Sequence, residues 1–153
     1  MARIEDIPQA TRDVVLALAC PELPGQPWVQ PKPLAQCRIA LLTSAALHRR
    51  SEMPFAAGSP EFRALPADLP ASDILMSHIS INYDRSGFER DINVAYPIDR
   101  LKELAAEGVI GSVAPTHYSV MGSTDPATMA ASADAITARL KQEGVDAVIL
   151  APV

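Results

Sequence analysis

The sequence predicts an α/β fold: a Rossmann-like, flavodoxin-like three-layer sandwich with a mostly parallel sheet. Short apolar runs such as "CRIALLTS" (37–44) and "VDAVILAPV" (145–153) have the composition of buried parallel strands. Amphipathic helical patterns alternate with these runs, and Gly and Pro residues separate them. Strands that alternate with helices form βαβ units, whose helices cover the faces of a parallel sheet.

The chain is predicted to divide into an N-terminal helix and Pro-rich arm, residues 1–36, and an α/β domain, residues 37–153. Residues 7–20 read as a helix because Pro8 occupies a first-turn position and apolar residues recur on one side. The stretch "PELPGQPWVQPKP" (21–33) carries five prolines, which exclude a helix or a central strand. We therefore expect an extended arm, with Trp28 filling a groove.

Four strands and two further helices are predicted in the α/β domain. One helix begins at Pro97 and ends at Gly108, and its apolar residues face one side. The other is capped by Thr124 or Asp125 and ends at Gly144. The predicted strands are 37–44, 72–77, 109–115 and 145–153, and the predicted helices are 97–108 and 124–144.

Composition excludes several classes of partner. A net charge of -5 and an aromatic content of 5% argue against a nucleic-acid surface, which needs basic side chains and stacking platforms. No apolar window is long enough to span a membrane. The N-terminus carries acids where a signal peptide carries basic residues, so we expect a cytoplasmic protein. The two cysteines, Cys20 and Cys37, are far apart and predict neither a metal site nor a disulfide.

One histidine follows each of the first three predicted strands: His48, His78 and His117. Because the carboxyl ends of parallel strands share one edge, we expect the three side chains to line the ligand-binding edge as catalytic groups. The alternative is that each is a capping or surface residue. Imidazole also suits zinc. The spacing contains no HxH, HxxxH or CxxC, so no metal site is predicted, and a metal-dependent lyase or hydrolase stays an alternative.

Polar residues in the loops predict a site for a small anion. Asp84 beside Arg85 could position a guanidinium fork for a carboxylate, and Arg49 gives its loop a positive charge. Ser119 belongs to a small-residue turn that precedes the last helix. The chain has no GxGxxG, no phosphate-binding GxxxxGK[ST] and no GxSxG, so nucleotide binding and a serine nucleophile have no support. A small-anion binding or regulatory domain without catalysis therefore remains an alternative.

Four stretches carry a resemblance to a known family. They are "LLTSAALHRR", "SPEFRALP", "SDILMSHISINYDRSGFERDINVAYPIDRLKELAAEGVIGSVAPTHYSVMGS" and "GVDAVILAPV". From about Arg38 to Val153 the chain resembles the glycine/sarcosine/betaine reductase component B and D-proline reductase selenoprotein family, and more narrowly its short, single-domain members. It departs from them at Ala45 and Ala46, where family members often have glycine in the loop after the first strand.

The resemblance implies a reductase that cleaves a C–N bond of a small anionic or zwitterionic substrate. In the family a selenocysteine, or a cysteine in its place, follows the strand that matches "VDAVILAPV", and a thioredoxin-like thiol donor regenerates it. We therefore expect this nucleophile immediately after Val153, at a selenocysteine codon decoded as a stop. The chain itself would then lack its natural C-terminal part, hold no cofactor and be inactive as given.

The resemblance also supplies site candidates, as positions in the matching motifs. A histidine is expected to act as general acid for the leaving amine, and Arg49 or Arg85 to hold a carboxylate. A homo-oligomer is expected, because a buried strand at the edge of the domain leaves apolar surface to cover. The catalytic candidates are His48, His78 and His117, and the substrate-binding candidates are Arg49, Asp84, Arg85, Asn93, Tyr118 and Ser119.

Overall fold

A computed structural model of the chain describes residues 3–17, 25, 28–80 and 83–153. The N-terminal helix α1 covers Gln9–Ala17, within the range predicted for it. Trp28 does not fill a groove, because 89% of its surface is exposed. Among the described residues, no helix combines the length and the apolar character that crossing a bilayer requires.

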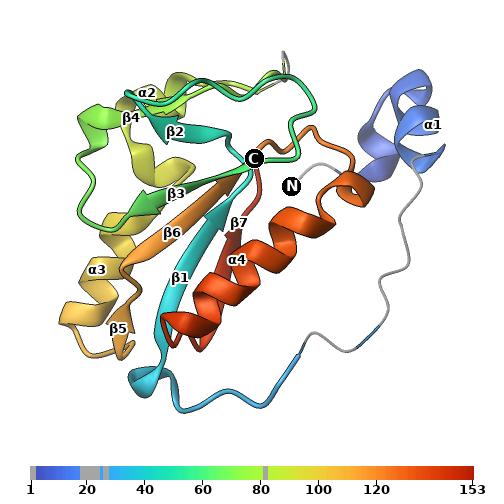
Figure 1. Cartoon of the computed structure of the whole chain (residues 1–153). Coiled ribbons are helices and arrows are strands. Elements are labelled where there is room, and N and C mark those ends of the chain that lie inside the picture. The colour runs from blue at the N-terminus through green and yellow to red at the C-terminus, as the bar shows by residue number, and fades with distance from the viewer. Residues whose placement is uncertain (1–2, 18–24, 26–27, 81–82) are drawn as a thin grey trace.

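The α/β domain is built around strand β1, Arg38–Thr43, which lies in the middle of the main sheet (Figure 1). Strand β7, Ala147–Ala151, runs parallel to β1 on one side. On the other side β1 pairs in parallel with β5, Ser112–Val113, and then with β6, Thr116–Val120. The fifth strand, β3, Phe62–Pro66, is antiparallel to β6. The sheet is therefore mixed but mostly parallel, which confirms the α/β class.

The predicted third strand, 109–115, is shorter in the structure, where it forms β5, and Pro115 separates β5 from β6. Proline has no N–H to give to a strand ladder, and pairing with β1 stops at Val113 and resumes in β6. The main-chain N–H of Leu41, which faces this break, donates instead to His117 Nδ1 at 2.9 Å. A side chain of β6 thus replaces the missing backbone partner of β1.

The predicted strand 72–77 is present but does not join the main sheet. It forms β4, Ile74–Met76, which pairs antiparallel with β2, Leu47–Arg49, in a separate two-stranded sheet. The chain leaves β1 through Ala46, whose φ of 54° lies in the left-handed region, and β2 then turns back over the domain. Local composition predicts a strand here, but its partner is β2 and not a strand of the main sheet.

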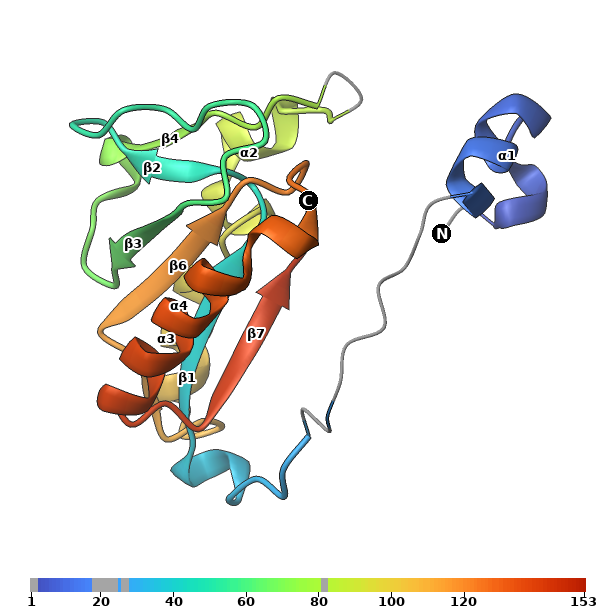
Figure 2. The same ribbon diagram turned by 45° about the vertical axis from the view of Figure 1, so that its right-hand side comes forward.

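Helices pack on opposite faces of the main sheet (Figures 1 and 2). Helix α3, Ile98–Ala106, buries Ile98 and Leu101 in the larger core, which includes Leu41 of β1. Helix α4, Ala130–Gln142, buries Ile136 against Tyr118 and Val120 of β6. The remaining helical elements are α2, Ser86–Arg90, and short 3-10 turns at Ile4–Asp6, Leu34–Gln36, Ala71–Asp73, Ile92–Val94 and Pro126–Thr128.

Candidate functional site

The carboxyl ends of β1, β6 and β7 meet around Ser44, the first residue after β1. The carbonyl oxygen of Ser44 accepts the N–H of Gly122 at 2.9 Å, which ties β1 to the end of β6. The N–H of Ser44 donates to the carbonyl of Ala151 at 3.3 Å, and its Oγ accepts the N–H of Val153 at 2.9 Å. One serine therefore fixes the ends of three strands at the edge where α/β proteins bind ligands.

His78 lies directly against this junction. A Cβ atom placed on Gly122 would lie 3.1 Å from His78 Nε2 and 2.9 Å from the carbonyl oxygen of Ser44. Both distances are shorter than ordinary contacts, so only glycine allows His78 to approach the backbone so closely. The His78 side chain is buried, with 5% of its surface exposed. The imidazole thus packs onto the edge where β1 and β6 end.

The environment of His78 favours a neutral imidazole with its proton on Nε2. The main-chain N–H of Ser80 donates to Nδ1 at 3.2 Å, so Nδ1 acts as the acceptor and the neutral ring carries its proton on Nε2. Burial lowers the pKa of His78, and the nearby Arg85 guanidinium lowers it further. Nε2 is buried and has no hydrogen-bond partner in the described part of the chain. The site therefore presents one unused N–H donor.

Arg85 and Tyr83 shape the loop that carries His78. Arg85 Nη2 donates to the carbonyl oxygen of His78 and, at 3.2 Å, to that of Ser80. The Tyr83 ring centroid lies 5.8 Å from that of His78, and its hydroxyl is buried without a partner among the residues described. Asp84 is exposed and accepts the N–H of Ser86 at 2.9 Å, a hydrogen bond that lowers the pKa of its carboxyl group. In the structure, the side chains of Asp84 and Arg85 therefore form hydrogen bonds within their own loop.

The three histidines lie in different elements of the fold, and their expected catalytic role stays a prediction. His117 lies inside β6, fully buried, because the strand predicted to precede it breaks at Pro115. Burial lowers the pKa of His117 to about 4, and Lys102 contributes further. His48 lies in β2, outside the main sheet, and its Nδ1 bonds the carbonyl of Arg49 at 2.9 Å. Of the three, the described junction includes only His78.

The other substrate-binding candidates are scattered. Ser119 is buried, and its Oγ accepts the N–H of Leu47 at 2.7 Å, which anchors β2 to β6. The Asn93 side chain joins Asp91 at 2.8 Å and Asp99 at 3.0 Å, at the start of α3. These contacts hold elements of the fold together.

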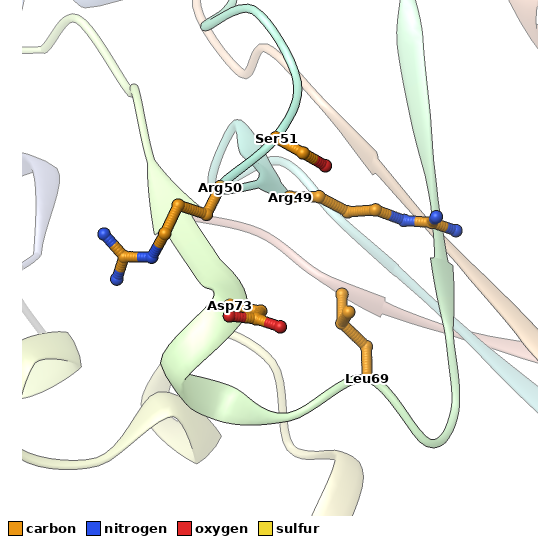
Figure 3. Close-up of a pocket in the computed structure, with 5 residues that line it drawn as sticks. All are labelled: Arg49, Arg50, Ser51, Leu69 and Asp73. Atoms are coloured by element: carbon orange, nitrogen blue, oxygen red, sulfur yellow. The ribbon is translucent and has the colours of Figure 1, made fainter.

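Arg49 and Tyr118 meet in a separate hollow beside β3. Figure 3 shows Arg49 and Arg50 extending in opposite directions, with Arg49 reaching toward β3. This view draws a different hollow, which has a volume of about 410 Å³ and is lined by Arg49, Arg50, Ser51, Leu69 and Asp73.

The described residues contain no group of three or more His, Cys, Asp or Glu side chains arranged to hold a metal ion. Cys37 is buried next to the start of β1, the end opposite the junction, and its Sγ donates to the carbonyl of Lys32 at 3.4 Å. Cys20 lies outside the described residues. Cys37 is therefore remote from His78 along the length of β1.

Sequence reasoning missed Ser44 and Tyr83 and noted Gly122 only as part of a small-residue turn. Ser44 and Gly122 each follow a strand, at the carboxyl edge where ligands bind. The position after a strand could have identified Ser44, because β1 was predicted. It could not have identified Gly122, because β6 was not. The closeness of residues 44, 78 and 122 depends on the way three strands end together.

Comparisons with known proteins give a consistent result. The family model described as glycine/sarcosine/betaine reductase selenoprotein B matches residues 67–153. The D-proline reductase subunit gamma of Acetoanaerobium sticklandii is 36% identical over 122 residues, which cover 78% of this chain and 50% of that protein. The glycine reductase complex component B subunit gamma of Carboxydothermus hydrogenoformans is 42% identical over 69 residues, 44% of this chain and 16% of that protein.

A third relative is the betaine reductase complex component B subunit beta of Peptoclostridium acidaminophilum. It is 40% identical over 73 residues, 47% of this chain and 17% of that protein. The chain thus spans half the length, or less, of the curated relatives that it matches. No solved structure matches.

Proposed function

The chain belongs to the glycine/sarcosine/betaine reductase selenoprotein B family, and we propose that it serves a reductase that cleaves a C–N bond of a small amino-acid-like substrate. The relatives are named as subunits of D-proline, glycine and betaine reductases, which supports membership of a multi-component reductase complex. The observation that carries the proposal for this chain is the unused Nε2–H donor of His78 at the carboxyl edge.

We assign His78 the role of a neutral hydrogen-bond donor to a substrate oxygen. A general acid must be protonated to give its proton away, and burial disfavours the charged imidazolium of His78. A neutral imidazole with Nε2–H still orients and polarises a carboxylate. This role replaces the general acid expected from the sequence, and Tyr83, whose hydroxyl lacks a described partner, supplies the second polar group.

The redox nucleophile is proposed to be the selenocysteine or cysteine expected after β7. Its selenolate or thiolate would attack the substrate carbon, and the C–N bond would break with its electron pair leaving on nitrogen. A donor thiolate would then attack the selenium or sulfur, the bond from this atom to carbon would break with its electron pair taking up a proton on carbon, and a second donor thiol would reduce the mixed selenenylsulfide or disulfide. Two observations support this position. The end of β7 is hydrogen-bonded to Ser44 beside His78, and Cys37 lies buried near the opposite end of β1. A thioredoxin-like donor and a cytoplasmic location suit this thiol chemistry.

The decisive experiment couples gene sequence with reconstitution. Reading the gene past the codon for Val153 should reveal a selenocysteine codon or a cysteine codon in frame, and its absence would overturn the nucleophile proposal. In the assembled complex, His78→Gln should lower substrate-dependent thiol oxidation at least tenfold, while Arg90→Gln, an exposed substitution in α2, should leave it unchanged. Equal rates for the wild type and His78→Gln would overturn the assignment of His78.

We also propose that two copies of the chain associate through the free edge of β7. Leu150 exposes 68% of its surface there, next to the exposed Ile149, and β1 is the described strand that pairs with β7 (Figure 2). An edge with apolar side chains favours antiparallel pairing with an identical strand. Leu150→Lys should shift the mass measured by light scattering to that of a monomer, and Met53→Lys, in an exposed loop, should not. A wild-type monomer would refute the proposal.

A further inference from the structure

The hollow that Arg49 and Tyr118 line lies between the C-terminal end of α4 and the edge strand β3. Its volume is about 620 Å³, within the range of small-molecule sites. It shares no residue with the junction of Ser44, His78 and Gly122. The lining residues are Arg49, Ala64, Pro66, Thr116, Tyr118, Arg139, Gln142 and Glu143, and we call this hollow the arginine groove.

Three polar atoms of the arginine groove are buried without a hydrogen-bond partner among the described residues. They are the Tyr118 hydroxyl, Glu143 Oε2 and Arg49 Nε. Tyr118 exposes only 1% of its surface. Buried polar atoms in proteins are almost always hydrogen-bonded, so each exception asks for an explanation. Here three exceptions come from three separate elements and line one hollow, which is the pattern that a bound ligand would resolve.

The charges of the groove define the ligand. Arg49 and Arg139 supply two guanidinium groups, and neither makes an ion pair with a carboxylate within the described ranges. Arg139 lies over the Phe62 ring, 5.2 Å from its centroid, which fixes its guanidinium beside β3. Glu143 supplies one carboxylate. The Tyr118 hydroxyl keeps its proton, because burial and then Glu143 raise its pKa, and Arg139 offsets this only in part.

We propose that the arginine groove binds a small zwitterion of amino-acid size, at a site separate from the carboxyl edge. The ligand's carboxylate accepts hydrogen bonds from Arg49, Arg139 and the Tyr118 hydroxyl, since guanidinium forks suit carboxylates. Its ammonium group donates to Glu143 Oε2. This arrangement satisfies all three orphaned atoms with one molecule, which neither a simple anion nor a simple cation does.

The test uses the purified chain and three probes that differ in their donors: glycine, betaine and acetate. Glycine carries a carboxylate and N–H donors, betaine carries a carboxylate and no N–H, and acetate carries no ammonium group. Isothermal titration should rank glycine above betaine and acetate. Arg139→Gln, an exposed substitution that leaves the core intact, should weaken glycine binding at least tenfold, and Tyr118→Phe should also weaken it. Glu143→Gln should remove the preference for glycine over acetate.

The matched control is Arg90→Gln, an exposed substitution in α2, which should leave glycine binding unchanged. His78→Gln separates the groove from the proposed reductase site: the glycine binding that remains in this variant should be lost when Arg139→Gln is added. Glycine binding that survives both Arg139→Gln and Tyr118→Phe would overturn the groove proposal, as would no binding of any probe. Loss of binding in His78→Gln alone would place the amino acid at the carboxyl edge instead, which would refute the groove and support the reductase site.

Discussion

Val153 donates its main-chain N–H to Ser44 Oγ at 2.9 Å, and the same hydroxyl lies 3.4 Å from the carbonyl oxygen of Val153, to which it donates. The two residues are 109 positions apart in the chain. This pair closes the ladder between β1 and β7 and holds the end of β7 beside His78. Ser44 therefore fixes the direction of the chain at Val153, just after β7.

Ser44→Ala should loosen the end of β7. The loss of a partly buried hydroxyl that accepts and donates costs about 1 kcal/mol in the free energy of unfolding, measured in urea. Amide hydrogen exchange at Val153 should accelerate, because its acceptor is removed. Ser51→Ala, at an exposed position in the loop after β2, is the matched control and should leave both quantities unchanged. Unchanged exchange at Val153 in Ser44→Ala would show that the pair does not hold β7.

Gly122→Ala should disturb the site and the fold together. The added methyl group would meet the carbonyl oxygen of Ser44 at 2.9 Å and His78 Nε2 at 3.1 Å, so one of them must move. Overpacking of this kind costs about 1–3 kcal/mol. Gly87→Ala is the control, since its new Cβ would lie 3.5 Å from Val94 and alanine favours the helix. The imidazole resonances of His78 should shift only in Gly122→Ala, and a stable variant with unshifted resonances would contradict the contact.

His117 should make stability depend on pH. Its pKa is about 4 in the folded chain and 6.5 in the unfolded chain, so between these values the unfolded state alone binds a proton. The stabilisation is complete above pH 6.5 and is lost as the pH falls toward 4, by up to about 3 kcal/mol. His117→Asn, which keeps an acceptor for the Leu41 N–H but does not titrate, should have a shallower decline of unfolding free energy over this window. Identical slopes would contradict the buried, neutral His117.

Ala46→Gly should stabilise the protein. Ala46 is buried with a φ of 54°, a conformation that costs an L-residue about 1–2 kcal/mol and glycine almost nothing. After the larger entropy of unfolded glycine is subtracted, we expect a gain of about 0.5 kcal/mol. The neighbouring Ala45→Gly, whose φ is not positive, should be destabilising. Thermal denaturation of the two variants tests the contrast, and equal shifts in Tm would contradict it.

The elements that could be predicted from the sequence are those with local signals. The helices at 97–108 and 124–144 have apolar stripes and Gly or Pro boundaries, and α3 and α4 lie within them. The strands at 37–44 and 145–153 are apolar runs and became β1 and β7. β6 was not predicted, because its residues were assigned to the turn between the strand 109–115 and the last helix, although four of its five residues are buried.

The site was only partly predictable, for a related reason. His78 could be found because it follows a predicted strand, and position relative to a strand can be read from the sequence. The same reasoning does not hold for His117, because a new strand begins directly after Pro115 and His117 lies inside it. Ser44 and Gly122 matter through their contacts with each other and with His78, which depend on three strands ending together. The spacing of these residues in the sequence does not predict that they lie close together.

Strand β6 carries Tyr118 into the arginine groove and leads, four residues later, to Gly122 against His78. The two sites are therefore connected through β6, which is hydrogen-bonded to β1 on one side and β3 on the other, and through the two residues that follow it. If a ligand in the groove displaces β6, the same movement reaches the imidazole, and thermodynamic reciprocity requires a substrate at the edge to alter the groove's affinity by the same factor.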